Sequence, residues 1–414
     1  MQKSMKLALP LHLACGVKIK NRIAKSAMSE DMADTNHSPT KNLCTLYQRW
    51  AQGGAGLLIS GNIMVNSNAL GEPNNVVIEK GLDNLEALKA WAEAGTKNST
   101  QFWVQLNHPG KQSPRFLSKK PMAPSAIGYA SPLSNFFNAP RAMNEEEIYD
   151  TIERFAYAAE LCKKAQFGGV QIHGAHGYLL SQFLSPIHNQ RSDSFGGSLE
   201  NRMRFAIKVY RAIRHAVGND FPVGIKLNSA DFQKGGFSEE ESMEVVKRLS
   251  EEGIDLLEIS GGTYESPKMM MGSEANESTI KREAYFLEYC AKVRSLIKTP
   301  IMLTGGFRTA QAMNNALEWG ACDLIGLARS LALDPDFANN LLLQKNSQSM
   351  VRPIKSGIRA FDKRAPLEIF WYTAQLKRMG LGKKPNPNAS PLWVLLSNLM
   401  QSGWHGLRRV RASK

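Results

Sequence analysis

Residues 171–178 read Gln-Ile-His-Gly-Ala-His-Gly-Tyr, and the rest of the chain is organised around this stretch. It begins with the apolar end of a strand and then breaks at two glycines, which tolerate the backbone angles of a turn. Two imidazoles and a phenol follow the strand within six residues: His173, His176 and Tyr178. Enzymes with parallel sheets place their chemistry just past their strands. The stretch therefore predicts an α/β fold with a site for a polar substrate oxygen.

Eight short apolar runs of this kind occur along the chain, and each is followed by a turn that contains Gly, Ser or Asn. They are Arg22–Lys25, Gly56–Ile59, Phe102–Gln105, Gly169–Ile172, Val223–Leu227, Leu256–Ile259, Ile301–Leu303 and Leu324–Leu327. We expect each run to be a strand.

Helical patterns separate these runs. The clearest is Glu147–Ala165, where apolar residues recur in steps of three and four, and Asn144 with Glu147 is typical of a capping box. Further helices are expected at Asn84–Gly95, Leu199–Val217, Glu239–Glu252, Ala284–Ile297 and Ala310–Trp319. Strands that alternate with helices pair in parallel, and eight of them favour a closed (β/α)8 TIM barrel. An open doubly wound sheet is the competing fold, but its Gly-x-Gly-x-x-Gly motif is not found.

Composition is that of a globular protein, with 414 residues of which 43% are hydrophobic. The start of the chain is not followed by a long apolar run, and no stretch is apolar enough to span a membrane. The five cysteines have no close spacing, so neither a disulfide framework nor a metal cluster is indicated. We expect a cytoplasmic protein without a metal site.

The formal net charge of +14 is concentrated at the C-terminus. Residues 341–414 hold 14 of the 51 Lys and Arg but only 2 of the 37 Asp and Glu, which leaves +2 for the rest of the chain. A nearly neutral body argues against a nucleic-acid partner. We expect residues 1–340 to form the barrel and residues 341–414 to form a basic, partly helical extension. Either the extension packs on the barrel or a second subunit, or it contacts a membrane or an acidic partner.

Polar residues gather after the other strands as well. Glycines 305 and 306 follow the seventh run, and Arg329 follows the eighth. Glycines and an arginine at these two strand ends are typical of a phosphate site in a barrel. Lys226 interrupts an apolar run and needs a partner if it is buried.

Each feature alone has a plainer interpretation. His173 and His176 could be hydrogen-bonded core residues or, less favoured by their spacing, zinc ligands with His108 as a third. Tyr178 alone is more often a packing residue. The two long segments Asn107–Asn144 and Ser260–Glu283 are candidates for lids over the site or for parts of the substrate pocket.

The order of these features resembles the old yellow enzyme family of FMN-dependent oxidoreductases. The resemblance covers roughly residues 5–340. It rests on seven segments. They are Lys-Asn-Arg-Ile…Ser-Ala-Met at 20–28, Val-Gln-Leu-Asn-His-Pro-Gly at 104–110, Pro-Met-Ala-Pro-Ser at 121–125, Ile-His-Gly…Leu-Ser-Pro at 172–186, Asn-Gln-Arg-Ser-Asp…Glu-Asn-Arg at 189–202, Thr-Gly-Gly at 304–306 and Ala-Arg…Asp-Pro at 328–335.

The resemblance implies a barrel that holds FMN at its mouth, with NADH or NADPH as the hydride donor and a small electron-poor alkene as substrate. The implied catalytic residues are His173 and His176, which bind the substrate oxygen, and Tyr178, which donates a proton. The implied cofactor-binding residues are Ser26, Ala27, Met28, Ser29, Ser60, Gly61, Gln105, Lys226, Gly305, Gly306, Ala328 and Arg329.

Two positions depart from the family pattern. Lys226 stands where most members carry Arg, and Ser29 stands where others carry Thr or Cys. Lysine lacks the fork geometry of arginine, so the potential of the flavin is expected to differ.

The activity that the resemblance implies is NAD(P)H-dependent reduction of the activated C=C bond of α,β-unsaturated carbonyl or nitro compounds. The alternatives are an FMN-dependent amine demethylase or dehydrogenase on the same scaffold, and a non-catalytic flavin-binding protein tethered by its tail. The sequence is compatible with an oligomer.

Overall fold

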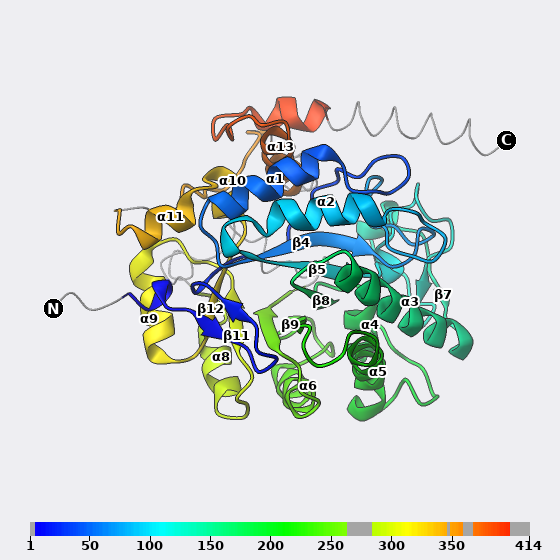
Figure 1. Ribbon diagram of the computed structural model, residues 1–414. Coiled ribbons are helices and arrows are strands. Elements are labelled where there is room, and N and C mark those ends of the chain that lie inside the picture. Colours follow the sequence, from blue (N-terminus) through cyan, green and yellow to red (C-terminus); the bar gives the residue numbers. More distant parts are fainter. Residues whose placement is uncertain (1–4, 263–283, 346–347, 359–366, 398–414) are drawn as a thin grey trace.

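The computed structural model describes residues 5–262, 284–345, 348–358 and 367–397. Eight parallel strands close into a barrel that is surrounded by helices (Figure 1). The strands follow one another around the barrel in chain order, and the last pairs with the first. They are β3 (Ile23–Lys25), β4 (Leu57–Met64), β5 (Gln101–Asn107), β8 (Gly169–Gly174), β9 (Val223–Asn228), β10 (Leu256–Ser260), β11 (Ile301–Thr304) and β12 (Leu324–Leu327). The predicted (β/α)8 fold is confirmed.

All eight predicted strands are present, but β4 runs five residues further than its apolar run. The pairing of β4 with β5 shifts register between Ile59 and Asn62, so the strand contains a bulge there. Gly61 lies inside this bulge, and a Cβ on it would meet the Met28 carbonyl oxygen at 2.3 Å. The bulge therefore needs glycine at this position, and it brings Asn62 to the mouth of the barrel.

The predicted helices are also present, with ends that differ by up to three residues. They are α2 (Leu85–Gly95), α3 (Glu145–Lys164), α5 (Leu199–Val217), α6 (Glu239–Glu251), α8 (Leu287–Arg294) and α9 (Ala310–Trp319). At the start of α3 the Asn144 side chain accepts a hydrogen bond from Glu147 N at 2.8 Å, and Glu147 accepts one from Asn144 N at 3.0 Å. The predicted capping box is confirmed. One helix between β3 and β4, α1 (Lys41–Gln52), was not predicted.

A hairpin of β1 (Leu11–His12) and β2 (Lys18–Ile19) closes the amino-terminal end of the barrel. Leu11 and Ile19 pack into one cluster with inward-facing barrel residues that include Trp103. A larger apolar layer lies between the barrel and its helices. One end of the barrel is therefore filled by packing, which leaves the carboxyl ends of the strands for the site.

Ten further elements complete the described part of the chain, and only the last is longer than six residues. They are η1 (Lys6–Ala8), η2 (Lys97–Ser99), η3 (Gly110–Gln112), β6 (Met122–Ala123), η4 (Leu133–Asn135), β7 (Arg141–Ala142), α4 (Leu179–Leu184), α10 (Arg329–Leu333), α11 (Phe337–Leu342) and α13 (Leu367–Gly380).

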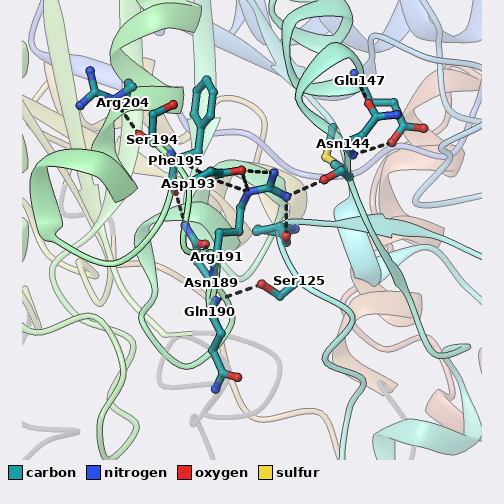
Figure 2. A network of polar contacts seen from close by, with 12 residues as sticks. Ser125, Asn144, Glu147, Asn189, Gln190, Arg191, Asp193, Ser194, Phe195 and Arg204 are labelled. Atoms are coloured by element: carbon teal, nitrogen blue, oxygen red, sulfur yellow. Dashed lines mark hydrogen bonds and ion pairs between the residues drawn. The ribbon is translucent and has the colours of Figure 1, made fainter.

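The loop after α4 is fastened to the long segment between β5 and α3 by Arg191 (Figure 2). Its guanidinium donates to Pro124 O at 2.9 Å and to Met143 O at 2.5 Å, and it forms an ion pair with Asp193. Backbone acceptors from separate stretches are thus held by one planar donor group, which suits arginine rather than lysine.

The described part of the C-terminal extension contacts the helices of the barrel. Helix α13 packs against α1 (Figure 1). The expected boundary at residue 340 falls inside α11, where Leu341 is buried. The division into two parts stays a prediction, and the basic residues 398–414 lie outside the described residues.

Within the described ranges, no helix is both long and apolar enough to cross a membrane.

Candidate active site

A cavity of about 270 Å³ opens at the carboxyl ends of the barrel strands. Ten of the expected site residues line it: Ala27, Met28, Ser29, Gln105, His173, His176, Tyr178, Lys226, Ala328 and Arg329. They come from five different strand ends, so only barrel closure brings them together.

The two imidazoles face each other at one side of this cavity. His173 Nε2 lies 3.2 Å from His176 Nδ1. His176 adopts a left-handed backbone conformation with φ 60°, and its N–H donates to Asn228 Oδ1 at 3.1 Å. A non-glycine residue with positive φ is strained unless its surroundings hold it. Asn228 at the end of β9 thus fixes the turn that aims His176 at His173.

The hydrogen-bond partners define where the protons of the pair lie. Asn62 Oδ1 lies 2.9 Å from His173 Nδ1, and Ser260 Oγ lies 2.9 Å from His176 Nε2. An amide oxygen only accepts, so His173 carries its proton on Nδ1 and accepts from His176 Nδ1–H. A half-turn of the Asn62 amide presents its NH₂ instead, which moves the His173 proton to Nε2. Both facing nitrogens then carry protons that can bond to one ligand oxygen.

Both imidazoles are neutral at neutral pH. Burial lowers the pKa of His173 and of His176 well below 6.5, and the nearby charge of Lys226 lowers both pKa values further. A neutral imidazole donates a hydrogen bond without placing a charge in the cavity.

Tyr178 lies beside the pair. Its ring centre is 4.6 Å from that of His173, and its hydroxyl oxygen accepts from Asn62 Nδ2 at 3.3 Å. Asn62 therefore orients both the phenol and an imidazole.

Lys226 is buried and paired within the protein. Its Nζ lies 3.1 Å from Glu258 Oε1, and the two side chains are 3% and 0% exposed. The sequence predicted that a buried Lys226 needs a partner, and β10 supplies it. Glu258 was missed although it interrupts an apolar run, which is the same signal that singled out Lys226.

Glu258 also joins Lys226 to the amide side chains of neighbouring strands. Glu258 Oε2 accepts from Gln171 Nε2, and Gln171 Oε1 accepts from Gln105 Nε2, both at 2.7 Å. Thr304 Oγ1 donates to Glu258 Oε1 at 2.7 Å. This network fixes the side chain of Gln105 next to a cation at the cavity wall.

Three expected cofactor residues line neither this cavity nor the smaller one that adjoins it. Ser26 Oγ lies 2.8 Å from Thr304 Oγ1, and Ser60 Oγ donates to Gly61 O and accepts from Gln105 N, both at 2.8 Å. Their polar groups hold adjacent strands together. Contact of Ser26, Ser60 and Gly61 with a cofactor stays a prediction.

A smaller cavity of about 80 Å³ adjoins the first and shares Ala328 and Arg329 with it. Gly305 and Gly306 line it with φ of 134° and 84°, and Arg308 is part of its wall. Glycines leave the backbone open to a close ligand, and arginine suits a phosphate.

The two cavities together fit FMN. The glycine-lined cavity suits the phosphate, and the apolar wall at Ala27 and Met28 suits the ring system. Gln105 and Lys226 offer an amide and a cation to the polar edge of the ring. The donor set is therefore compatible with a flavin nucleotide.

The expected lid between β5 and α3 does not cover the cavity. None of its described residues from 107 to 144 is in the cavity wall, because the segment is bound to the loop after α4 instead. His108, considered as a third metal ligand, is not in the wall either, and its Nδ1 accepts from Gly110 N. The other expected lid, Ser260–Glu283, lies mostly outside the described residues.

Helix α13 provides the part of the wall that sequence reasoning missed. Its contributing residues are Glu368, Ile369, Tyr372, Thr373 and Leu376. Asn62 and Glu72 were also missed. Asn62 is shifted into place by the bulge in β4. No local sequence pattern marks Glu72 or shows where α13 packs on the barrel.

Comparison with known proteins places the chain in a family. Residues 6–348 match the NADH:flavin oxidoreductase/NADH oxidase family. An NADH-dependent flavin oxidoreductase of Hypocrea jecorina is 36% identical over 351 residues, which cover 79% of this chain and 86% of that protein. A similarly named protein of Neonectria is 34% identical over 371 residues, and this chain spans only 48% of its length.

A solved structure agrees with these matches. The old yellow enzyme homologue from Zymomonas mobilis has a TM-score of 0.69 and 25% identity, over 83% of this chain and 94% of that one. The chain therefore belongs to the NADH:flavin oxidoreductase/NADH oxidase family, the family of old yellow enzyme, and its cofactors are FMN and a nicotinamide nucleotide.

Proposed function

We propose that the protein uses NADH or NADPH to reduce the activated C=C bond of α,β-unsaturated carbonyl or nitro compounds. The observation that carries this proposal is the convergence of His173 Nε2 and His176 Nδ1, 3.2 Å apart, beside the phenol of Tyr178. This arrangement combines two donors for one oxygen with one group for proton transfer.

The imidazole pair binds the oxygen that conjugates with the alkene. As hydride reaches the β-carbon, negative charge develops on that oxygen, and two donors aimed at it stabilise the transition state. His173 is buried and His176 is half-buried, so water has limited access to the same oxygen. FMN, when bound, supplies the hydride.

Tyr178 completes the reaction by protonating the α-carbon. A phenol suits this step, because an enolate is basic enough to take its proton while water is excluded. Asn62 holds the Tyr178 oxygen and His173 in one network, so the proton donor and the oxygen site keep a fixed relation.

Gln105, Lys226 and the glycine-lined cavity hold the cofactor in this proposal. The Lys226–Glu258 pair places a compensated cation where most relatives have arginine, so the field at the flavin is weaker than an unpaired guanidinium would give.

The test separates the two half-reactions. The holoenzyme is reduced anaerobically with NADH or NADPH, and cyclohex-2-enone is then added while flavin absorbance is followed. We expect bleaching by the nicotinamide and rapid return of the colour with the enone, together with saturated ketone as product.

Two outcomes would contradict the proposal. Reduction of the flavin by N-methylated amines, with no reoxidation by enones or nitroalkenes, would favour the dehydrogenase alternative. Failure of both nicotinamides and amines to bleach a protein that holds FMN would favour a non-catalytic flavoprotein.

A further inference from the structure

The backbone turn at His176 is held by residues that do not line the cavity. The His176 N–H donates to Asn228 Oδ1 at 3.1 Å, and Asn228 is the last residue of β9. The other end of the Asn228 side chain is also bound, because Nδ2 donates to Asp231 Oδ1 at 3.1 Å. Asn228 and Asp231 are each 1% exposed, and neither is in the cavity wall. A buried carboxylate thus lies two hydrogen bonds away from the backbone of His176.

The backbone donors at the two ends of this chain of bonds define which atoms accept. His176 N–H and Phe237 N–H can only donate. The first requires the carbonyl oxygen of the Asn228 amide, which turns the NH₂ of that amide toward Asp231. Phe237 N donates to Asp231 Oδ2 at 3.3 Å, so both carboxylate oxygens face donors. A reversed Asn228 amide would lose both of its bonds, so its orientation is fixed.

His176 needs this support because of its backbone conformation. A non-glycine residue at φ 60° is strained and persists only where its surroundings hold it. In this conformation His176 Nδ1 lies 3.2 Å from His173 Nε2, and His176 Nε2 lies 2.9 Å from Ser260 Oγ. His176 is half-buried whereas His173 is buried, so packing restrains the His176 ring less. The position of this donor therefore depends on the turn.

Asp231 also has a local structural task. Its own N–H donates to Phe237 O at 2.9 Å, and its Oδ2 accepts from Phe237 N, so these bonds close the loop after β9. The bond to Asn228 uses the other carboxylate oxygen, Oδ1. Because the two tasks use different oxygens of one carboxyl group, substitutions can distinguish them.

We propose that Asp231 is a positioning residue for the substrate-oxygen site, because it fixes the Asn228 amide that holds the turn at His176. Without this bond the amide is free to rotate, and His176 no longer keeps its donor aimed at the oxygen that His173 also binds. This inference deepens the proposed function and rests on it for the role of the imidazole pair.

The experiment exchanges the two side chains. In Asp231→Asn a single carbonyl oxygen must serve both Asn228 Nδ2 and Phe237 N–H, so one of these bonds is lost. In the double variant Asn228→Asp/Asp231→Asn, the carboxylate at position 228 accepts from His176 N–H and from the new amide. The oxygen of that amide accepts from Phe237 N–H. All three bonds and the net charge are therefore restored.

The first readout is the Kd of phenol for the oxidised holoenzyme, measured by the change in flavin absorbance. Phenol carries its oxygen on an unsaturated carbon, as an enolate does, but offers no activated alkene. We expect this Kd to rise about fivefold in Asp231→Asn, the usual effect of one net hydrogen bond. In the double variant it should return to within about twofold of the wild-type value. The kcat/KM for cyclohex-2-enone should change in the same order.

Asp255→Asn is the matched control. Asp255 is a buried carboxyl at the opposite end of the same strands, where Oδ2 accepts from Val223 N at 2.8 Å and pairs with Arg214. We expect this variant to have a lower Tm and an unchanged Kd of phenol. A loss that is purely structural is thus recognised by its effect on Tm alone.

Three results would overturn the role of Asp231. One is a lower Tm in Asp231→Asn with an unchanged Kd of phenol. Another is a double variant that does not fold, or that binds phenol no better than Asp231→Asn, because loop closure alone would then explain the residue. The third is an equal rise of Kd in Asp255→Asn. Wild-type protein that binds phenol but reduces neither enones nor nitroalkenes would contradict the proposed function instead.

Discussion

Lys226 Nζ lies 3.1 Å from Glu258 Oε1 inside the barrel, where both side chains are almost fully buried. The pair links β9 to β10 and is joined to Gln105 through Gln171. Two opposite charges at this point let a cation face the cavity without leaving an isolated charge in the core.

The substitution Glu258→Gln tests this pairing. It leaves the lysine charge buried without its partner, so we expect the free energy of unfolding to fall by about 3–5 kcal/mol. Chemical denaturation of the FMN-free protein measures it. The control is Arg211→Gln, which breaks an exposed pair with Glu252 and should cost about 0–1 kcal/mol. Equal losses of unfolding free energy in both variants would show that the buried pair contributes no more to stability than an exposed pair.

Tyr178→Phe tests the proton donor. We expect reoxidation of the reduced flavin by cyclohex-2-enone to slow by about 10²–10⁴-fold, which is the usual contribution of a positioned acid. Reduction by the nicotinamide should stay near the wild-type rate, because hydride transfer to the flavin needs no proton from the phenol. Stopped-flow absorbance resolves the two steps, and an equal loss in both would contradict the assigned role.

Gly306→Ala tests the phosphate cavity. Gly306 has φ 84°, and a Cβ there would lie 3.1 Å from Ala284 N and from the ring of Tyr285. We expect the Kd for FMN to rise at least about tenfold, because the cavity closes on the ligand. Fluorescence titration of FMN-free protein with FMN measures it.

Gly382→Ala is the matched control for this substitution. Gly382 also has a positive φ, of 72°, but a Cβ on it would meet nothing within 4 Å. It adds similar backbone strain without filling a cavity. If both variants lose FMN equally, strain and not the cavity explains the effect.

The carboxyl of Glu72 predicts that the stability of the protein depends on pH near neutrality. Burial first and the charge of Asp31 second raise the pKa of this carboxyl from 4.5 to about 7, against the opposing effect of the Ser29 hydroxyl. A carboxyl whose pKa is raised by folding favours the folded state while protonated, so stability is lost as pH rises from about 4.5 through about 7.

The substitution Glu72→Gln removes this titration. We expect the decline of Tm between pH 5 and pH 7.5 to be shallower in the variant than in the wild-type protein. Glu72 also lies in the cavity wall, so KM for a neutral alkene should rise above pH 7 in the wild-type enzyme only. Parallel pH profiles for the two proteins would refute the assignment.

Many site residues could be predicted from the sequence, because in a barrel the residues that follow each strand lie at the same end of the fold. Residues just past apolar runs meet at one mouth whichever strands they follow, so His173, Gln105 and Arg329 could be grouped before any contact was known. The capping box at Asn144 was similarly visible, because capping depends on residues three positions apart.

The contacts that orient those residues could not be predicted from the sequence in this way. Asn62 reaches His173 only because a bulge shifts the register of β4, and a bulge leaves no periodic signal in a strand that contains glycine. Glu258 meets Lys226 because two neighbouring strands align, with Lys226 opposite Glu258 in the register. Such pairs depend on how strands are placed side by side.

The sequence by itself determined the strand order, most of the helices around the barrel, the barrel, the cluster of His173, His176 and Tyr178, and the resemblance that implied FMN. These follow from local periodicity and from motifs whose residues lie close along the chain. Only the tertiary structure decided that Glu258 neutralises Lys226 and that Tyr372 of the C-terminal extension enters the cavity wall. Those contacts join residues far apart in sequence, and their formation depends on packing between whole elements, which no local pattern encodes.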